Sequence, residues 1–238
     1  MTFCIRKSPS RGLTALYGFP QKPVTTLSMG LVHLDPGDRF GETLNRRECV
    51  LLLLRGAIAI KGNAIEPVSL SAPVDLLAES PTLIHCPPGI FSMKSEQGAE
   101  LLLIRGDLVK NTEGGAPAIT HGRVLAAGGT RLYMPNQPTS FLHAGCYALG
   151  TGTKRLDLGS LSGDNGSGMD SVWFFDGKEG AFSAHVVISD AGRPVEEFEI
   201  TGGTAVVVPA GMRAECTVTQ GRALACWGAR NGTLAAAK

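Results

Sequence analysis

The sequence predicts an all-β protein built from two copies of one domain, a sandwich or barrel in each half. Short apolar runs rich in β-branched residues recur at intervals of about ten residues, separated by Gly- and Pro-containing turns. No amphipathic helical pattern extends beyond a few turns. Two of the apolar runs end in a Pro-x-Gly corner, at Pro87 and at Pro209, and the offset of 122 residues between them is close to half of the 238-residue chain.

The same offset aligns two further pairs of segments without a gap. Residues 50–53 fall on residues 172–175, and residues 104–106 fall on residues 226–228. Three landmarks in one register are typical of a tandem repeat. We therefore expect two domains, residues 1–116 and 117–238, joined at a polar, Gly-rich linker over residues 111–117.

In the first half, an extended arm over residues 1–30 leads into a strand expected over residues 26–34. The next four residues, Asp-Pro-Gly-Asp, have the composition of a turn. Residues 48–63 predict two strands joined near Arg55 and Gly56, because six apolar residues between Gly-containing turns are too short for a helix. Short strands and turns follow over residues 68–84, and further strands over residues 91–95 and 99–104.

The second half repeats this pattern. Val-rich runs suit a pleated, half-buried surface, whereas Pro cannot donate to a strand ladder and Gly can adopt the positive φ of a tight corner. Strands are therefore expected over residues 141–149, 156–161, 172–175, 182–188, 198–200, 206–208 and 223–227.

Composition excludes several functional classes. With 22 Lys and Arg against 21 Asp and Glu, the net charge of +1 predicts no general attraction to nucleic acid or to a membrane surface. The longest apolar run, residues 49–54, is far below the ~20 residues of a membrane span, and we expect a soluble, cytoplasmic protein. The six cysteines include no Cys-x-x-Cys pair, so buried free thiols are predicted.

Gly203, five further residues and then Pro209-x-Gly211 resemble the second signature of the cupin superfamily. The order of four segments narrows the resemblance: over roughly residues 25–230 the chain is similar to the 5-deoxy-glucuronate isomerases of inositol catabolism. The four segments are residues 47–57, 86–89, 172–175 and 206–211. The resemblance implies a tandem cupin, or bicupin, of two jelly-roll β-barrels.

In that family the carboxyl-terminal barrel holds a divalent metal through a His-x-His pair, a Glu and a later His. Such a metal polarises a sugar carbonyl during conversion of an aldose to a ketose. In this chain those positions fall on Asn165 and Ser167, on Asp170 or Ser171, and on Arg213 or Ala214. The corresponding positions of the first half are Thr43, Asn45, Glu48 or Cys49, and Phe91. Because none is His, we predict that neither barrel binds a transition metal in the family's manner and that no cofactor is used.

Two other groups of residues could form metal sites, but a purely structural role is favoured for both. The five histidines are dispersed, and a cluster of His143, His185 and a carboxylate is less typical than isolated His residues in strands. Asp164, Asn165 and Asp170 lie in or near a Gly-bounded stretch, but their spacing is not that of a calcium loop, which favours a plain loop.

Arg213 follows the second Pro-x-Gly corner, where its planar guanidinium could bind a carboxylate or phosphate through two hydrogen bonds. The alternative is that it faces water or pairs with Glu215 or Glu197. Trp173 and Phe175 either line a sugar pocket by stacking or pack in the core. The candidate catalytic residues are Asp170 and Arg213, and the candidate substrate contacts are Asn165, Trp173, Phe175 and Arg213.

Two hypotheses of function follow. The first is a sugar or sugar-acid isomerase in which Arg213 orients the carboxylate and Asp170 or a neighbouring His moves the proton. The second is a bicupin without catalysis that serves as a small-ligand binding or regulatory module and forms a homodimer through its sheet faces. Both predict a small sugar acid or similar anion as partner, and fold alone does not distinguish them.

Overall fold

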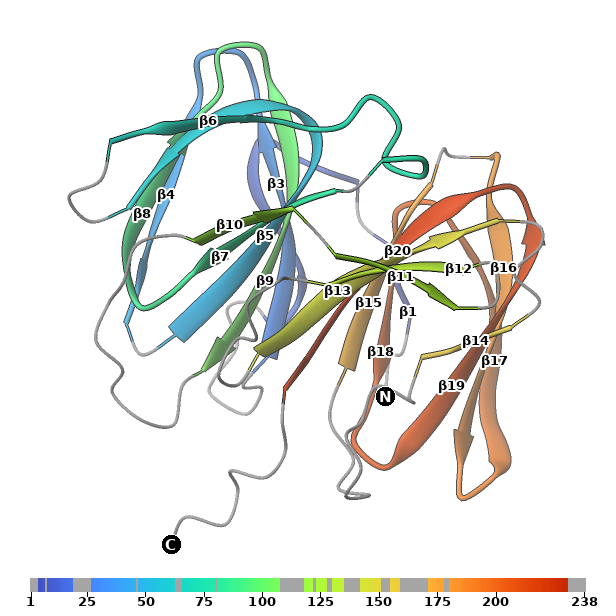
Figure 1. Cartoon of the computed structure of the whole chain (residues 1–238). Helices are drawn as coiled ribbons and strands as arrows, with labels where there is room; N and C mark the ends of the chain where they lie inside the picture. Colours follow the sequence, from blue (N-terminus) through green and yellow to red (C-terminus); the bar gives the residue numbers. More distant parts are fainter. Residues whose placement is uncertain are drawn as a thin grey trace, which may run out of the picture. The chain divides into compact units, whose positions relative to one another are not determined.

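The computed structural model describes residues 4–6, 8–18, 27–45, 47–62, 66–79, 81–107, 118–121, 123–127, 130–134, 142–150, 155–158, 171–177 and 180–230. The regular elements of this part of the chain are all β-strands, as the sequence predicts (Figure 1). The chain divides into two compact units. The N-terminal unit comprises residues 8–123 and 135–142, and the C-terminal unit comprises residues 1–7, 124–134 and 143–238.

The N-terminal unit is a curled arrangement of nine strands, in which one long strand joins two groups. The larger group has the order β10-β7-β5-β9-β3-β2, and the smaller group consists of β4, β8, β6 and the second part of β5. The bounds are β2 (Gly12–Tyr17), β3 (Leu27–Leu34), β4 (Arg39–Leu44), β5 (Arg47–Lys61), β6 (Val68–Ser71), β7 (Thr82–Cys86), β8 (Gly89–Lys94), β9 (Ala99–Asp107) and β10 (Ala118–His121).

The C-terminal unit has the same plan, with a large sheet of order β1-β18-β15-β20-β13-β12-β11 and a small sheet of order β14-β19-β16-β17. The bounds in the large sheet are β1 (Cys4–Arg6), β11 (Arg123–Ala127), β12 (Thr130–Met134), β13 (Leu142–Leu149), β15 (Ser171–Asp176), β18 (Thr204–Val208) and β20 (Ala223–Arg230). Those in the small sheet are β14 (Leu156–Asp157), β16 (Ser183–Asp190), β17 (Arg193–Thr201) and β19 (Met212–Gln220).

The tandem repeat is visible in the strand order. The central strands β7-β5-β9-β3 of the N-terminal unit correspond to β18-β15-β20-β13 of the C-terminal unit. Moving Thr82–Cys86 by the offset of 122 residues gives 204–208, the bounds of β18. The Pro-x-Gly corner that follows β18 forms as predicted, because Gly211 has a φ of +84° and the amide of Met212 donates to the carbonyl of Pro209.

A short strand precedes each repeat and joins the sheet formed by the other repeat. β1 pairs with β18, placing Cys4 opposite Val206, whereas β10 pairs with β7, placing Ala118 opposite His85. The units therefore do not follow a single boundary between residues 116 and 117. The segment expected to be an arm, residues 1–30, contributes β1 to one unit and β2 to the other. The predicted linker, residues 111–117, lies outside the described residues.

The two strands expected over residues 48–63 form the single strand β5, whose pairing with β9 shifts register between Leu53 and Arg55. Gly56 follows this irregularity with a φ of +76°, and a Cβ there would clash with the backbone carbonyl of Gly98. Only glycine suits this close approach of two strands. The bulge lets one strand serve both groups of the N-terminal unit.

Each unit has its own apolar core. In the N-terminal unit, side chains from both strand groups pack together, among them Leu51, Ile60, Phe91 and Leu103. All six cysteines are free thiols, five of them buried, as the sequence predicts. In the described part of the chain, no helix has the length and apolar character needed to cross a membrane.

Candidate functional site

The structure tests only part of the predicted site. Asn165 and Asp170, and with them Ser167, lie outside the described residues. Trp173, Phe175 and Arg213 are described, on β15 and β19 of the C-terminal unit.

Trp173 and Phe175 are both fully buried in the core of the C-terminal unit. The indole of Trp173 stacks on Tyr147 at a centroid distance of 6.0 Å, and its Nε1 donates to the carbonyl of Leu158 at 3.0 Å. The ring of Phe175 stacks on Phe182 at 6.1 Å. Core packing, one of the two interpretations of these rings, is therefore the one that the structure shows, and neither ring offers an exposed face to a sugar.

Arg213 and Ala214 lie on opposite faces of β19, because successive side chains of a strand alternate. Ala214 is buried in the aromatic core, whereas Arg213 is exposed, with its backbone paired to Ser189 of β16. The position facing the interior thus carries a methyl group. A residue that orients a ligand inside the barrel must point inward, so the exposed Arg213 does not lie where that role requires.

The acids proposed as partners of Arg213 have other contacts. Glu215 forms an ion pair with Arg155, and the Oε2 of Glu197 lies 3.7 Å from the Nε2 of His185. Of the two alternatives for Arg213, exposure to water is the one observed.

The ligand positions of the first repeat are equally unsuited to a metal. Thr43 and Asn45 are exposed on either side of the buried Leu44, while Cys49 and Phe91 are buried in the core. Across the described residues, no group of three or more His, Cys, Asp or Glu side chains could hold a metal ion. Of these four described positions, only Cys49 and Phe91 face the core, and together the four do not offer the imidazoles and carboxylate of the family's metal site.

Glu48, the fifth of these positions, has a structural contact. Its carboxylate is buried, with Oε2 2.9 Å from the Nε2 of His85, while Oε1 accepts a hydrogen bond from the amide of Leu142 at 2.9 Å. All three residues of this buried network belong to the N-terminal unit, which includes Leu142. The sequence signal for it is weak, because the network joins residues that are far apart in the chain.

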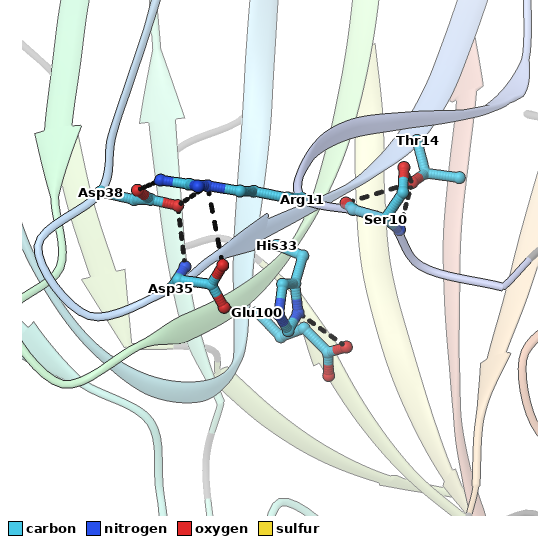
Figure 2. Close-up of polar contacts among 7 residues, drawn as sticks. All are labelled: Ser10, Arg11, Thr14, His33, Asp35, Asp38 and Glu100. Atoms are coloured by element: carbon cyan, nitrogen blue, oxygen red, sulfur yellow. Dashed lines mark hydrogen bonds and ion pairs between the residues drawn. The ribbon is translucent and has the colours of Figure 1, made fainter.

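A group of charged side chains lies at one end of the large sheet of the N-terminal unit (Figure 2). His33 on β3 and Arg55 on β5 are each paired in register with Glu100 on β9, which lies between them. The Oε2 of Glu100 accepts a hydrogen bond from the Nη1 of Arg55 at 2.5 Å, and its Oε1 lies 3.7 Å from the Nδ1 of His33. The pairing of three neighbouring strands thus assembles an imidazole, a carboxylate and a guanidinium in one row.

The turn after β3 supplies a second carboxylate to this group. The Oδ1 of Asp35 lies 3.6 Å from the Nε2 of His33. Arg11 extends across the turn, where its Nε donates to the Oδ2 of Asp38 at 2.8 Å (Figure 2). That hydrogen bond is the main cause that lowers the pKa of Asp38, so the carboxylate stays ionised and holds the turn through the amide of Asp35.

The row of His33, Glu100 and Arg55 lines an open groove of about 420 Å³. Its lining includes His33, Asp35, Arg55 and Glu100, together with Gly56 and Gly98, where the two backbones come close. The Nδ1 of His33 is buried and has no hydrogen-bond partner among the described residues, and 3.7 Å to Glu100 is too long for a hydrogen bond. The groove therefore presents one cation and two carboxylates, while the Nδ1 of His33 is shielded from solvent.

Sequence reasoning missed this groove. The available signal was a titratable residue, His33, in the mainly apolar strand 26–34, which is followed by the Asp-Pro-Gly-Asp turn.

No family model matches the sequence, and no curated protein matches it. Solved structures do match. An IolB-like protein from Salmonella typhimurium has a TM-score of 0.72 at 12% identity, covering 98% of this chain and 94% of its own. The oxalate decarboxylase of Lactobacillus farciminis, in complex with formate, has a TM-score of 0.66 at 11% identity. The match covers 97% of this chain and 86% of the decarboxylase. The protein YlbA of Escherichia coli gives 0.65 at 12% identity, covering 94% and 86%.

These matches extend over almost the whole chain and agree with its duplicated strand order. They show the fold, which is that of a tandem cupin.

Proposed function

We propose that this bicupin binds a small sugar acid in the groove formed by His33, Asp35, Arg55 and Glu100. The observation that carries the proposal is the row of His33, Glu100 and Arg55 across three paired strands, which opens into a groove rather than into the core. A rigid sheet positions such groups more accurately than a loop does.

The chemistry of the groove matches that of a sugar acid. Arg55 offers a planar guanidinium that can bind a carboxylate through two hydrogen bonds. Asp35 and Glu100 can accept hydrogen bonds from sugar hydroxyls, and the imidazole of His33, whose side chain is 40% exposed, lies beside both. The volume of about 420 Å³ lies within the range of about 300–1,000 Å³ that is usual for small-molecule sites.

The structural neighbours support the choice of an acid. One is described as IolB-like, and another is an oxalate decarboxylase with bound formate, so small carboxylic acids occur among the ligands named for this fold. We carry over to this chain only the class of ligand, because at 12% and 11% identity the neighbours share the fold alone.

We favour binding over the metal-assisted isomerisation of the 5-deoxy-glucuronate isomerases. Of the described residues that the sequence places at the site of the C-terminal unit, those facing the core are Ala214, Trp173 and Phe175, and none of the three can bind a metal or move a proton. The second hypothesis, a small-ligand binding or regulatory bicupin, therefore has the stronger support.

A thermal-shift series tests the proposal. The melting temperature is measured with glucuronate, galacturonate, glucose and sodium chloride at equal ionic strength, each with and without EDTA. We expect the two uronates to raise it, glucose to raise it less, and EDTA to change nothing. Stabilisation that requires a divalent metal, together with new sugar signals by NMR after incubation, would instead support the isomerase.

A further inference from the structure

A second hollow lies on the outer face of the N-terminal unit, formed by the small strand group. Three basic side chains, Arg39 on β4, Lys61 on β5 and Lys94 on β8, line an opening of about 250 Å³ together with Ala59 and Ser92. It shares no lining residue with the groove at His33.

Strand pairing brings these side chains together. Lys94 of β8 is paired with Arg39 of β4 on one side and with Ala59 of β5 on the other. Lys61, two residues beyond Ala59, is on the same face of β5 and is paired with Ser92. The alternate residues Ile60 and Met93 point into the core, so the basic side chains point outward.

The hollow exists because its central side chain is small. Ala59 lies opposite Lys94, and its methyl group leaves space between the longer basic side chains. Gly41, paired with Ser92 on the other side of β8, likewise adds no side chain to this face.

The charge of the hollow is poorly balanced. Like charges directly opposite each other on neighbouring strands are destabilising, and Arg39 and Lys94 form such a pair. Lys94 contacts Glu96, but across the described residues no acid forms an ion pair with Arg39 or Lys61. The whole chain has a net charge of only +1, so this concentration of cations is local.

We propose that the hollow binds a phosphate group, either free phosphate or the phosphate of a small phosphorylated metabolite. Arg39 supplies a planar pair of donors, Lys61 and Lys94 supply compact charges, and the hydroxyl of Ser92 supplies a neutral donor. The bound dianion offsets the repulsion between Arg39 and Lys94. The proposal is independent of the sugar-acid groove, because the hollow lies on the small strand group and its cations, Arg39, Lys61 and Lys94, do not line the groove.

Ala59→Glu tests the proposal most sharply, because it fills the hollow and adds a carboxylate between the cations. Isothermal titration with inorganic phosphate and with glucose 6-phosphate is carried out on the wild-type protein, Ala59→Glu, Lys61→Gln and, as a control in the C-terminal unit, Arg193→Gln, at constant ionic strength. Inorganic phosphate and the sugar phosphate distinguish the two sources of the group.

We expect saturable binding to the wild-type protein and to Arg193→Gln, with affinity reduced about tenfold in Lys61→Gln, since one charge-assisted contact is lost. Ala59→Glu should abolish binding and raise the melting temperature without phosphate. Binding to Ala59→Glu as tight as to the wild type, or no wild-type binding beyond that of chloride, would overturn the proposal. Both outcomes leave the uronate measurements unaffected.

Discussion

His33 and Glu100 lie directly opposite each other on β3 and β9, with 3.7 Å between the Nδ1 of the imidazole and the Oε1 of the carboxylate. The other oxygen of the same carboxylate accepts a hydrogen bond from Arg55. Glu100 therefore lies beside His33 and is hydrogen-bonded to Arg55, the cation that we assign to the ligand's carboxylate. Under the proposed function, a ligand acid must displace Glu100 from Arg55, and we expect this competition to make the groove selective.

Changing Glu100 to Gln should shift the selectivity of the groove from a uronate toward a simple carboxylate. The neutral amide no longer competes for Arg55, so a simple carboxylate such as acetate should bind more tightly. A uronate should gain less, because the amide oxygen is a weaker acceptor for its hydroxyl groups than a carboxylate oxygen. Titration of the wild-type and Glu100→Gln proteins gives the dissociation constant of acetate divided by that of the uronate. This ratio should be lower for Glu100→Gln than for the wild type. An unchanged ratio would show that Glu100 does not set selectivity.

The two core tryptophans should differ in what their indole N–H groups contribute to stability. The Nε1 of Trp173 donates to Leu158 and to Ser171, whereas the buried Nε1 of Trp227 has no partner among the residues described. Trp173→Phe leaves the carbonyl of Leu158 with only the longer hydrogen bond from the Ser171 hydroxyl, at 3.4 Å, which costs about 1 kcal/mol beyond the loss of packing.

Trp227→Phe is the matched control, because it loses similar packing and no hydrogen bond. Urea unfolding should give a free energy of unfolding lower for Trp173→Phe than for Trp227→Phe by about 1 kcal/mol or more. Equal losses would mean that the hydrogen bonds of Trp173 contribute nothing net.

Glu48 should be important for stability although it lies outside the groove. Its buried carboxylate contacts His85 and the amide of Leu142. Glu48→Ala removes an acceptor from both groups and should cost about 3 kcal/mol, whereas Glu48→Gln retains an acceptor oxygen and should cost about 1 kcal/mol.

Glu197→Ala serves as the control for Glu48, since this exposed acid lies 3.7 Å from His185. Its loss should change the free energy of unfolding by no more than about 0.5 kcal/mol. Chemical denaturation of the three variants measures these values, and a cost for Glu48→Ala as small as that for Glu197→Ala would contradict the assignment.

The buried thiols predict a loss of stability at alkaline pH. Burial in the C-terminal core raises the pKa of Cys216 from 9.0 to about 12. The unfolded thiol ionises first, so the stabilising contribution of the neutral buried thiol is fully present below pH 9 and is lost as the pH rises toward 12.

Cys216→Ala removes this group and should reduce the slope of unfolding free energy against pH above pH 9, relative to the wild type. Identical slopes for the two proteins would show that Cys216 does not titrate with a raised pKa.

The fold could be predicted because its signals are local. A Pro-x-Gly corner after a Val-rich run identifies the end of a strand, and the 122-residue repeat relates β7 to β18. The exchange of β1 and β10 could not be predicted, because a short strand carries no information about which sheet it joins. Likewise, nothing in the segment of residues 48–63 distinguishes two strands from one strand that continues through a bulge.

The site was harder to predict. The alternation on β19 did contain useful information: Ala214 and Cys216 are apolar while Arg213 and Glu215 are charged, which places Arg213 on the outer face. The row of His33, Glu100 and Arg55 depends on the registers of three strands and on a bulge in one of them. None of these can be read from the residue types alone.

The central claim is that the groove of the N-terminal unit, rather than the barrel of the C-terminal unit, binds a sugar acid. The most direct test is isothermal titration of glucuronate into the wild-type protein, Arg55→Gln and Arg213→Gln, all treated with EDTA. The account predicts saturable binding to the wild-type protein and to Arg213→Gln, and an affinity at least about tenfold weaker for Arg55→Gln. Binding that is lost in Arg213→Gln and retained in Arg55→Gln would contradict it.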